Sequence, residues 1–237
     1  MNDILSKICD KLKAAGVRPS TRVGVYSKNS PHVTALTVGC WKLGATVVPL
    51  SLRFSAIQLK QAIQSFSCGI IFVSRALAGI DIAKNKLIIE NFLGDDVVLP
   101  QGLRFDECDF NPNADASIIL TSGSTGTPKG VLHTIANHYY SAAGSCGNIP
   151  FTEDHCWAAS LPMYHISGFS LIMRSLVGGG SIYYPAPGES LSQTVMPKKV
   201  THISLVPAQL KELMKKPGCI KRLKNYSAIL VGGSSIP

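Results

Sequence analysis

The sequence lacks any long apolar run. Lys42 interrupts the apolar stretch at residues 33–50, and Arg174 interrupts the one at residues 166–177, so no segment reaches the ~20 residues that span a bilayer. Residues 1–13 contain no continuous apolar region of the kind that a signal peptide needs. The seven cysteines are odd in number and scattered, and they form no CxxC pair. We therefore expect a soluble protein of the reducing cytoplasm, without a membrane span, a disulfide framework or a cysteine metal knuckle.

Charged residues are also few, at 16% of the 237 residues against 46% hydrophobic ones. This composition excludes a disordered chain, and the length allows one large domain or two small ones. The formal net charge of +9 predicts anionic partners. The densest basic segment, residues 211–224, has no aromatic residue before Tyr226 on which bases could stack, which favours a solvated face and no nucleic-acid partner.

Short apolar runs alternate with helical patterns along the first part of the chain. Ser30 and Pro31 are a typical helix start, and Gly44 can end that helix. Val-rich runs at residues 22–27 and 45–50 flank it, which predicts a βαβ unit. A second unit follows, with a helix that begins at Ser55 and a buried strand at residues 69–73.

The pattern loosens over residues 77–113, where only residues 87–90 have the character of a strand. We place a boundary there and expect two α/β subdomains, residues 1–113 and 114–237. In the second we expect helices at residues 134–143, 167–176 and 208–215, and strands at residues 117–120, 157–160, 181–184, 202–206 and 228–231. Uninterrupted apolar strands between helices predict an α/β fold with largely parallel sheets covered by helices.

The most informative segment runs from Thr121 to Gly130 and reads TSGSTGTPKG. Its three glycines let backbone N–H groups converge on an anion, its five hydroxyls add donors, and Lys129 supplies a mobile positive charge. We expect it to join a strand to a helix and to bind a polyphosphate. A flexible turn is the alternative, but it would not explain a lysine after the rigid Pro128.

Two common nucleotide motifs are absent. The Walker A pattern needs Lys-Ser or Lys-Thr directly after its second glycine, whereas Pro128 precedes Lys129 and Gly130 follows it. The dinucleotide fingerprint GxGxxG is missing as well, because no third glycine is in register with Gly123 and Gly126. The chain is therefore expected to be neither a P-loop NTPase nor a Rossmann dehydrogenase.

The TSGSTGTPKG segment resembles the phosphate loop of the adenylate-forming enzymes, the superfamily of acyl- and aryl-CoA synthetases. Further segments resemble landmarks of that superfamily in its order, namely WKLGA at residues 41–45, VPL at 48–50, LPMYHISG at 161–168, VPAQL at 206–210 and GGS at 232–234. Within the superfamily, HISG and SLVPAQL are most similar to o-succinylbenzoate–CoA ligases of menaquinone synthesis. The resemblance covers nearly the whole chain.

The resemblance implies roles for single residues. The nucleotide phosphates would lie on the loop, the adenine on the turn that closes the last strand, and the acid in a pocket whose wall is His165; Lys129 and His165 would be the catalytic residues. The implied nucleotide-binding residues are Thr121, Ser122, Gly123, Ser124, Thr125, Gly126, Thr127, Lys129, Gly232, Gly233 and Ser234, and the implied substrate-binding residues are His165, Ser167, Gly168, Arg174 and Val206.

Simpler structural roles are open for three of these features. A lone histidine is by default a structural residue, and a plain strand-to-loop turn is the competing account of Gly232–Ser234. Arg174 either lies exposed on the polar side of a helix or faces a substrate carboxylate, as the resemblance implies. The remaining histidines have no spacing that suggests a metal site.

The implied activity is that of an AMP-forming acid–CoA ligase, which uses ATP, Mg²⁺ and coenzyme A to convert a carboxylate to an acyl-adenylate and then to a thioester. The expected acid is o-succinylbenzoate; the alternatives are another aryl or fatty acid, or a non-catalytic nucleotide- or acyl-binding module. Superfamily members continue past the Gly-Gly-Ser turn into a ribose-binding segment and a mobile C-terminal domain. We therefore expect this chain to act as a fragment that is poorly active unless a separate C-terminal domain or another copy completes it.

Overall fold

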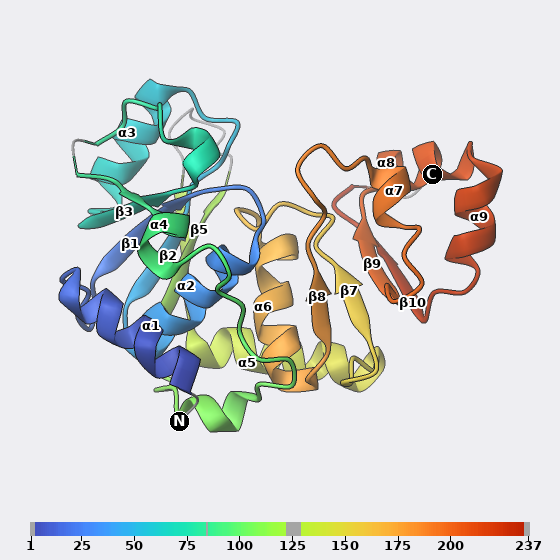
Figure 1. Ribbon diagram of the computed structural model, residues 1–237, viewed down its shortest axis with the longest axis horizontal. Helices are drawn as coiled ribbons and strands as arrows, with labels where there is room; N and C mark the ends of the chain where they lie inside the picture. Colours follow the sequence, from blue (N-terminus) through green and yellow to red (C-terminus); the bar gives the residue numbers. More distant parts are fainter. Residues whose placement is uncertain (1–2, 84, 122–128, 235–237) are drawn as a thin grey trace.

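The computed structural model describes residues 3–83, 85–121 and 129–234. Within them the chain forms two β-sheets with helices against both, which confirms the predicted α/β class (Figure 1). The first sheet has the strand order β4-β3-β1-β2-β5-β6, and the second has the order β10-β9-β7-β8. No helix in the described ranges is long and apolar enough to cross a bilayer.

The first sheet is parallel except at one edge. β1 (Arg22–Tyr26) is central and pairs in parallel with β2 (Thr46–Pro49) and β3 (Ile70–Val73), as the two predicted βαβ units require. β4 (Leu87–Ile88) extends the sheet beyond β3, and β5 (Asp115–Thr121) joins it beside β2. The predicted strand at residues 87–90 is shorter than expected because α4 (Ile89–Leu93) begins within it.

Local capping explains where the first helices begin. Ser30 Oγ accepts a hydrogen bond from the Val33 amide at the start of α2 (Pro31–Lys42), with Pro31 in the first turn. Ser55 and Gln58 form a reciprocal capping box on α3 (Ala56–Ser65). α1 (Asp3–Ala14) packs on α2, where Gly39 permits the close approach because a Cβ there would lie 2.6 Å from Ile8 Cγ2.

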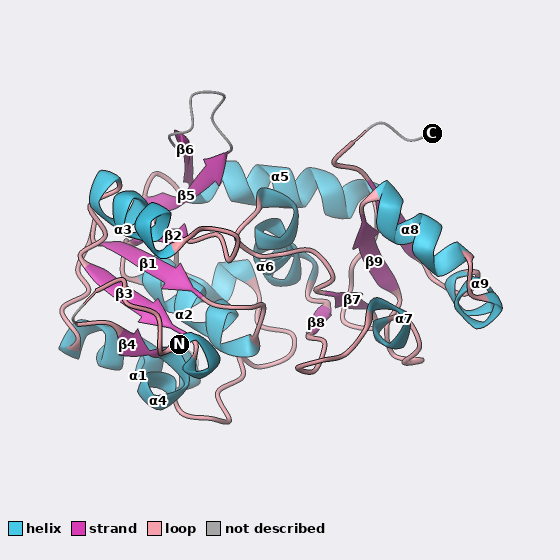
Figure 2. Cartoon of the chain, turned by 90° about the horizontal axis from the view of Figure 1, so that it is seen from above, coloured by secondary structure: helices cyan, strands magenta, loops and turns pink. Residues whose placement is uncertain are grey.

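The Gly-rich segment does not lead directly into a helix, contrary to our expectation. A further strand, β6 (Lys129–Thr134), pairs antiparallel with β5 and forms a hairpin, and α5 (Ile135–Asn148) begins only after Thr134 (Figure 2). The exposed side chains of β6 show no apolar period, which is why the strand was not predicted. Gly130 lies against Phe66 and Ile118, so a side chain at this position would collide with both.

The second sheet is wholly parallel. Its strands are β7 (Cys156–Ala158), β8 (Ser181–Tyr183), β9 (His202–Leu205) and β10 (Ala228–Val231). α6 (Ile166–Gly178) lies between the two sheets and packs on α5 (Figure 1). The remaining helices, α7 (Leu191–Thr194), α8 (Pro207–Met214) and α9 (Pro217–Leu223), form the far end of the molecule.

The sheets divide the chain at a different place from the predicted subdomain boundary. β5 and β6 follow residue 113 but belong to the first sheet, so the change of sheet falls between Thr134 and Cys156. The loose composition of residues 77–113 therefore marks a long connection within the first sheet. One continuous hydrophobic core runs across the junction, where Trp41 from α2 meets Phe169 from α6 at 5.9 Å between ring centroids.

Candidate functional site

A pocket of about 290 Å³ opens at the carboxyl ends of β9 and β10, next to the first turns of α6. Open α/β sheets usually bind their ligands at this edge. We call it the Arg174 pocket; it is lined by Leu161, Ser167, Arg174, Ser204, Leu205, Val206, Leu230, Val231, Gly232 and Gly233. Five of the implied site residues, distant in sequence, thus share one cavity: Ser167, Arg174, Val206, Gly232 and Gly233.

Arg174 is the distinctive group of this pocket. Its side chain is half-buried, and its guanidinium carbon lies 5.1 Å from the centroid of the Trp157 ring. Within the described part of the chain the guanidinium makes no hydrogen bond or ion pair, and Nε is buried without a partner. Burial lowers the pKa of Arg174, since desolvation disfavours the charged form. A partly desolvated cation without a counter-ion is costly, so binding of an anion beside it is favourable.

Two residues that the sequence analysis missed hold the wall behind Arg174. Trp157 on β7 is almost fully buried, and its indole Nε1 donates to Ser204 Oγ at 3.2 Å. Ser204 lies on β9 and lines the pocket. The available signal was a serine between the apolar Ile203 and Leu205, because a hydroxyl inside a strand must find a partner or face a cavity.

The first turn of α6 forms the second wall. Gly168 is buried and lines a small adjoining cavity with Ser167 and Arg174. A Cβ at Gly168 would lie 2.5 Å from the Leu161 carbonyl oxygen, so only glycine lets the helix begin this close to residues 161–162. Asn29, in the loop after β1, holds the same segment, because its amide donates to the carbonyls of Ala159 and Leu161 at 2.8 and 2.7 Å.

His165 lies beside this pocket without lining it. It is the N-cap residue of α6, yet its exposed side chain makes no capping hydrogen bond, and its ring packs on Tyr164 with 4.7 Å between centroids. Partial burial and, to a smaller extent, the positive charge of Arg53 lower the pKa of His165. A histidine in this state is neutral at pH 7 and can donate or accept a hydrogen bond.

The turn after β10 forms another wall of the Arg174 pocket. The Gly232 amide donates to the Leu205 carbonyl at 3.1 Å, which ties the turn to β9. Gly233 has a φ of +88°, a conformation that favours glycine, and a Cβ on it would contact Val206 at 3.4 Å. Ser234 follows and is exposed, whereas the adjacent glycines leave the backbone open to a flat ligand.

Thr121 and Lys129, the two implied site residues of the phosphate loop that the structure describes, lie elsewhere, at the ends of β5 and β6. Thr121 and Lys129 face each other in the last pair of the ladder, where Thr121 Oγ1 donates to the Lys129 carbonyl at 3.3 Å. Lys129 is exposed and forms no ion pair with any described residue. The other implied residues of the loop, Ser122, Gly123, Ser124, Thr125, Gly126 and Thr127, lie outside the described residues.

The profile of one protein family, described as AMP-binding enzyme, matches residues 1–237. The chain belongs to this family.

Curated members of the AMP-binding family resemble the chain over its whole length. The 2-succinylbenzoate–CoA ligase of Geobacillus sp. (strain WCH70) is 29% identical over 243 residues, which cover 100% of this chain and 48% of the relative. That of Staphylococcus aureus (strain MSSA476) is 30% identical over 255 residues, covering 98% and 51%. The chain therefore spans about half the length of the curated relatives it matches.

A solved structure shows the same fold. It is the O-succinylbenzoate coenzyme A synthetase (MenE) from Bacillus subtilis in complex with AMP, which superposes with a TM-score of 0.80 at 23% identity. The match covers 99% of this chain and 48% of that one.

One residue of the basic segment at residues 211–224 has a structural role. Arg222 donates to the carbonyls of Met196, Pro197, Lys198 and Val200, and its guanidinium carbon lies 4.7 Å from the Tyr226 ring centroid. This arginine therefore fixes residues 196–200 against α9. Lys211, Lys215, Lys221 and Lys224 are exposed around it, in keeping with the expected solvated face.

Proposed function

We propose that the chain is the substrate- and nucleotide-binding part of an AMP-forming acid–CoA ligase whose acid is 2-succinylbenzoate. The observation that carries the proposal is the unpaired, half-buried guanidinium of Arg174 at the end of a parallel sheet. A dicarboxylate fits this group, because one carboxylate can pair with the fork of the guanidinium while the other reacts. The two curated relatives, both 2-succinylbenzoate–CoA ligases, support the same choice of acid.

In the proposed reaction a carboxylate oxygen of the acid attacks the α-phosphorus of ATP. An oxygen–phosphorus bond forms, the bond to pyrophosphate breaks, and an acyl-adenylate results. The thiol of coenzyme A then attacks the acyl carbon, a thioester forms, and AMP leaves. Two anions must approach each other in the first step, so cations and N–H donors that are already in place lower its barrier.

The residues of this chain would share the work of that first step. Arg174 holds the carboxylate that does not react, and Ser167 and Gly168 form the wall beside it. His165, the neutral N-cap residue of α6, lies between the acid and the nucleotide and donates a hydrogen bond to them. Lys129 and the hydroxyl loop neutralise the phosphates, and the open backbone at Gly232–Ser234 receives the adenine.

Magnesium and coenzyme A belong to the same proposal. The described residues contain no cluster of three or more His, Cys, Asp or Glu side chains suited to a metal ion. Mg²⁺ commonly binds through substrate phosphates with few protein ligands, so it would enter as the ATP complex. The half of the relatives that this chain does not span would contribute to the thioester step, within one polypeptide or as a separate domain. We also propose a cytoplasmic location, since all seven cysteines are unpaired.

Calorimetric titration of 2-succinylbenzoate into the purified chain tests the acid. We expect binding, and we expect Arg174→Lys to weaken it about tenfold or more, because lysine keeps the charge but loses the planar fork. Benzoate, with a single carboxylate, should bind much more weakly than the dicarboxylate. The control is Arg22→Lys, on the far sheet, where Arg22 is exposed and its guanidinium donates to the Phe66 carbonyl. Equal affinity of the wild type and Arg174→Lys would reject the pairing, and tighter binding of a long-chain fatty acid would identify a different ligase.

A further inference from the structure

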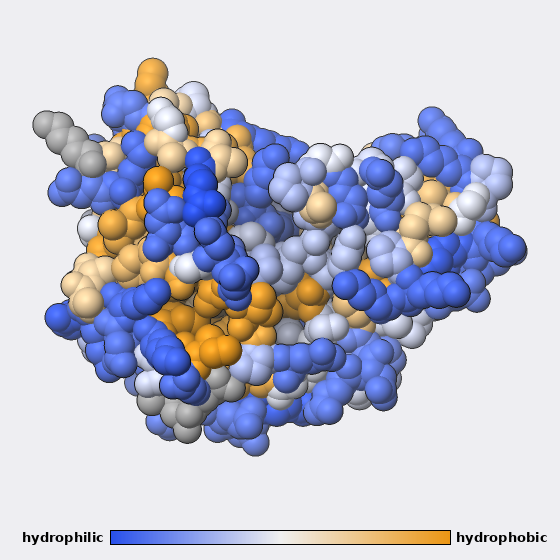
Figure 3. Space-filling view, viewed as in Figure 1, coloured by the Kyte–Doolittle hydropathy of each residue, from blue (hydrophilic) through white to orange (hydrophobic). Residues whose placement is uncertain are grey.

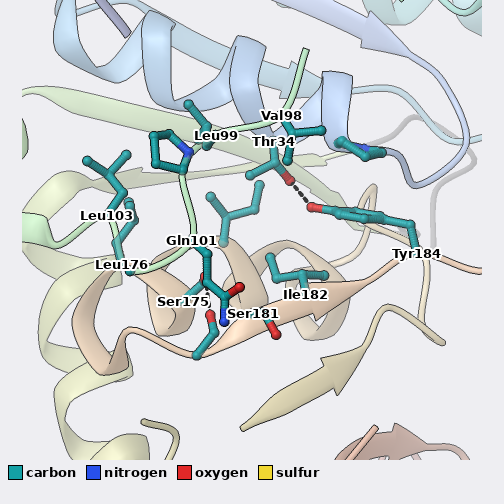
Figure 4. Close-up of a pocket in the computed structure, with 15 residues that line it drawn as sticks. Thr34, Val98, Leu99, Gln101, Leu103, Ser175, Leu176, Ser181, Ile182 and Tyr184 are labelled. Carbon is teal, nitrogen blue, oxygen red and sulfur yellow. Dashed lines mark hydrogen bonds between the residues drawn. The ribbon is translucent and has the colours of Figure 1, made fainter. Parts of the chain in front are cut away.

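A second pocket lies on the opposite side of α6 from Arg174. Its volume is about 210 Å³, and α2, residues 98–103, α6 and β8 surround it. Ile172, Ser175 and Leu176 of α6 face this cavity, whereas Ser167, Leu171 and Arg174 of the same helix face the other side. We call it the Tyr184 pocket, after the residue whose ring forms one wall (Figure 4).

The lining of the Tyr184 pocket contains no ionisable group other than the Tyr184 phenol. No Asp, Glu, Lys, Arg or His is among its 15 lining residues. Burial raises the pKa of Tyr184, so its hydroxyl stays protonated, and that hydroxyl is hydrogen-bonded to Thr34 Oγ1 at 2.5 Å. Neither an anion nor a cation would find a counter-charge here, because desolvating an unpaired charge is costly. The pocket therefore selects neutral ligands.

Most polar side chains of the lining are already satisfied. Thr34 and Tyr184 bond each other, Ser175 Oγ donates to the Gly180 carbonyl at 2.6 Å, and Ser181 Oγ donates to the His155 carbonyl at 3.2 Å. Among the described lining residues, the carboxamide of Gln101 is the one polar side chain without a protein partner. Figure 4 shows it reaching from residues 98–103 toward Ser175 and Ser181. A ligand would thus meet apolar walls and one free hydrogen-bonding group.

Size narrows the ligand class further. A cavity of about 150 Å³ suffices to hold benzene, so the observed volume takes one six-membered ring with a small substituent. Hydrophobic residues gather on this face, over α1, α2 and the neighbouring part of α6 (Figure 3), and Val98 at the rim is 57% exposed. Apolar surface of this kind is costly to leave in water and is typical of ligand sites.

We propose that the Tyr184 pocket is a second binding site, for a neutral monocyclic molecule that carries one hydroxyl or amide group. The ring packs against Leu99, Leu103, Leu176 and Ile182, and the polar substituent bonds the Gln101 carboxamide. The site is separate from the Arg174 pocket, and its occupation does not depend on the proposed ligase reaction.

Nuclear magnetic resonance titration of the full chain with three probes of equal size tests the site. The probes are benzyl alcohol, benzoate and benzylamine. We expect benzyl alcohol to shift the amide resonances of Gly102, Ser175 and Ile182, and the two charged probes to leave them unchanged. Benzoate should instead shift Ser167 and Gly233 at the Arg174 pocket. If benzyl alcohol leaves all three Tyr184-pocket resonances unmoved, or if benzoate shifts them equally, the site does not exist as proposed.

Two variants of the exposed Gln101 test how charge and hydrogen bonding at the Tyr184 pocket affect ligand binding. Gln101→Asp places a carboxylate in the neutral lining, so we expect it to weaken benzyl alcohol binding about tenfold and to create binding of benzylamine. Gln101→Leu should weaken benzyl alcohol but not toluene, because it removes the hydrogen bond alone. Gln61→Asp on α3 is the matched control, since Gln61 is also exposed and lies outside the pocket. Unchanged benzyl alcohol affinity in both Gln101 variants would overturn the proposal.

Discussion

In its proposed role, Arg174 favours substrate binding at the expense of stability. A half-buried cation with no counter-ion among the described residues destabilises the folded state, so replacing it with methionine of similar length removes a penalty. We predict that Arg174→Met leaves the free energy of unfolding unchanged or raises it by about 1 kcal/mol, while it abolishes dicarboxylate binding. Urea denaturation with parallel calorimetry measures both quantities.

Arg222→Met is the matched control for that prediction. Arg222 donates to four backbone carbonyls, and losing these bonds should cost about 2–4 kcal/mol of unfolding free energy. If the Arg174 variant were destabilised as much as the Arg222 variant, Arg174 would be a structural residue.

The proposed contact between Lys129 and the ATP phosphates can also be tested with a single substitution. Its side chain is exposed and pairs with no described residue, so Lys129→Ala should leave stability within ~0.5 kcal/mol of the wild type. It should weaken ATP binding by about 1.5–3 kcal/mol, the worth of a charge-assisted contact. Titration with Mg-ATP checks this, and Lys13→Ala on α1, another exposed lysine, serves as control. Unchanged ATP affinity in the Lys129→Ala variant would show that Lys129 does not contact the phosphates.

Two buried histidines make stability depend on pH. Burial lowers the pKa of both His138 and His202 from 6.5 to about 4, His138 being bonded to Ser117 Oγ at 2.8 Å. Below pH 6.5 the two histidines bind protons in the unfolded chain but stay neutral in the folded chain until the pH approaches 4. The free energy of unfolding therefore falls as the pH decreases from 6.5 toward 4, and this loss is absent above pH 6.5. We predict a loss of about 2 kcal/mol per histidine between pH 7 and pH 5.

Urea unfolding at pH 7, 6 and 5 measures that loss. His138→Gln keeps a hydrogen-bonding group for Ser117 but does not titrate, and it should remove about half of the pH dependence. A wild-type chain equally stable at pH 7 and pH 5 would contradict the prediction.

At the scale of elements, the β5–β6 hairpin depends on one glycine. A Cβ at Gly130 would lie 2.5 Å from Ile118 Cγ2 and closer still to Phe66. We predict that Gly130→Ala lowers the free energy of unfolding by about 1–3 kcal/mol through overpacking. Gly144→Ala is the control, because Gly144 lies within α5 with open space around it, and alanine there should stabilise by about 0.5–1 kcal/mol. Thermal unfolding compares the two variants, and an equally stable Gly130→Ala would show that the hairpin shifts freely.

The elements that could be predicted from the sequence are those whose signals are local. Ser30 with Pro31, and Ser55 with Gln58, start helices through bonds within one turn, and the apolar strands β1, β2 and β3 follow from composition alone. β6 escaped prediction because it is stabilised by pairing with β5, not by any pattern of its own. The same holds at the candidate site, where the burial of Arg174 depends on Trp157 and Ser204, which lie on strands distant in sequence.

At the scale of the whole molecule, charge is distributed unevenly. Residues 195–237 hold eight of the 23 lysines and arginines and one of the 14 acidic residues, which gives +7 of the net +9. This end of the chain includes β9 and β10, whose carboxyl ends form the Arg174 pocket. A positive field around a pocket speeds the arrival of anions and is screened by salt.

We therefore predict that the association rate of Mg-ATP or the dicarboxylate falls as the ionic strength rises. The double variant Lys211→Glu/Lys215→Glu, on α8 and at its C-cap, should slow association several-fold at low salt and should flatten the salt dependence. Lys7→Glu/Lys13→Glu on α1 changes the net charge equally at the other end of the molecule and should have a smaller effect. Stopped-flow measurement of the association rates compares the two double variants. Equal slowing by both would show that the rate depends only on the total charge.

Helix α6 is a wall shared by two cavities, since Arg174 faces one and Ser175 faces the other. Thermodynamic linkage makes any influence between them reciprocal: the factor by which a ring in the Tyr184 pocket changes carboxylate affinity equals the factor by which carboxylate changes affinity for the ring. The measured factor therefore gives the coupling free energy between the two pockets, and it can be obtained from two titrations without a second structure.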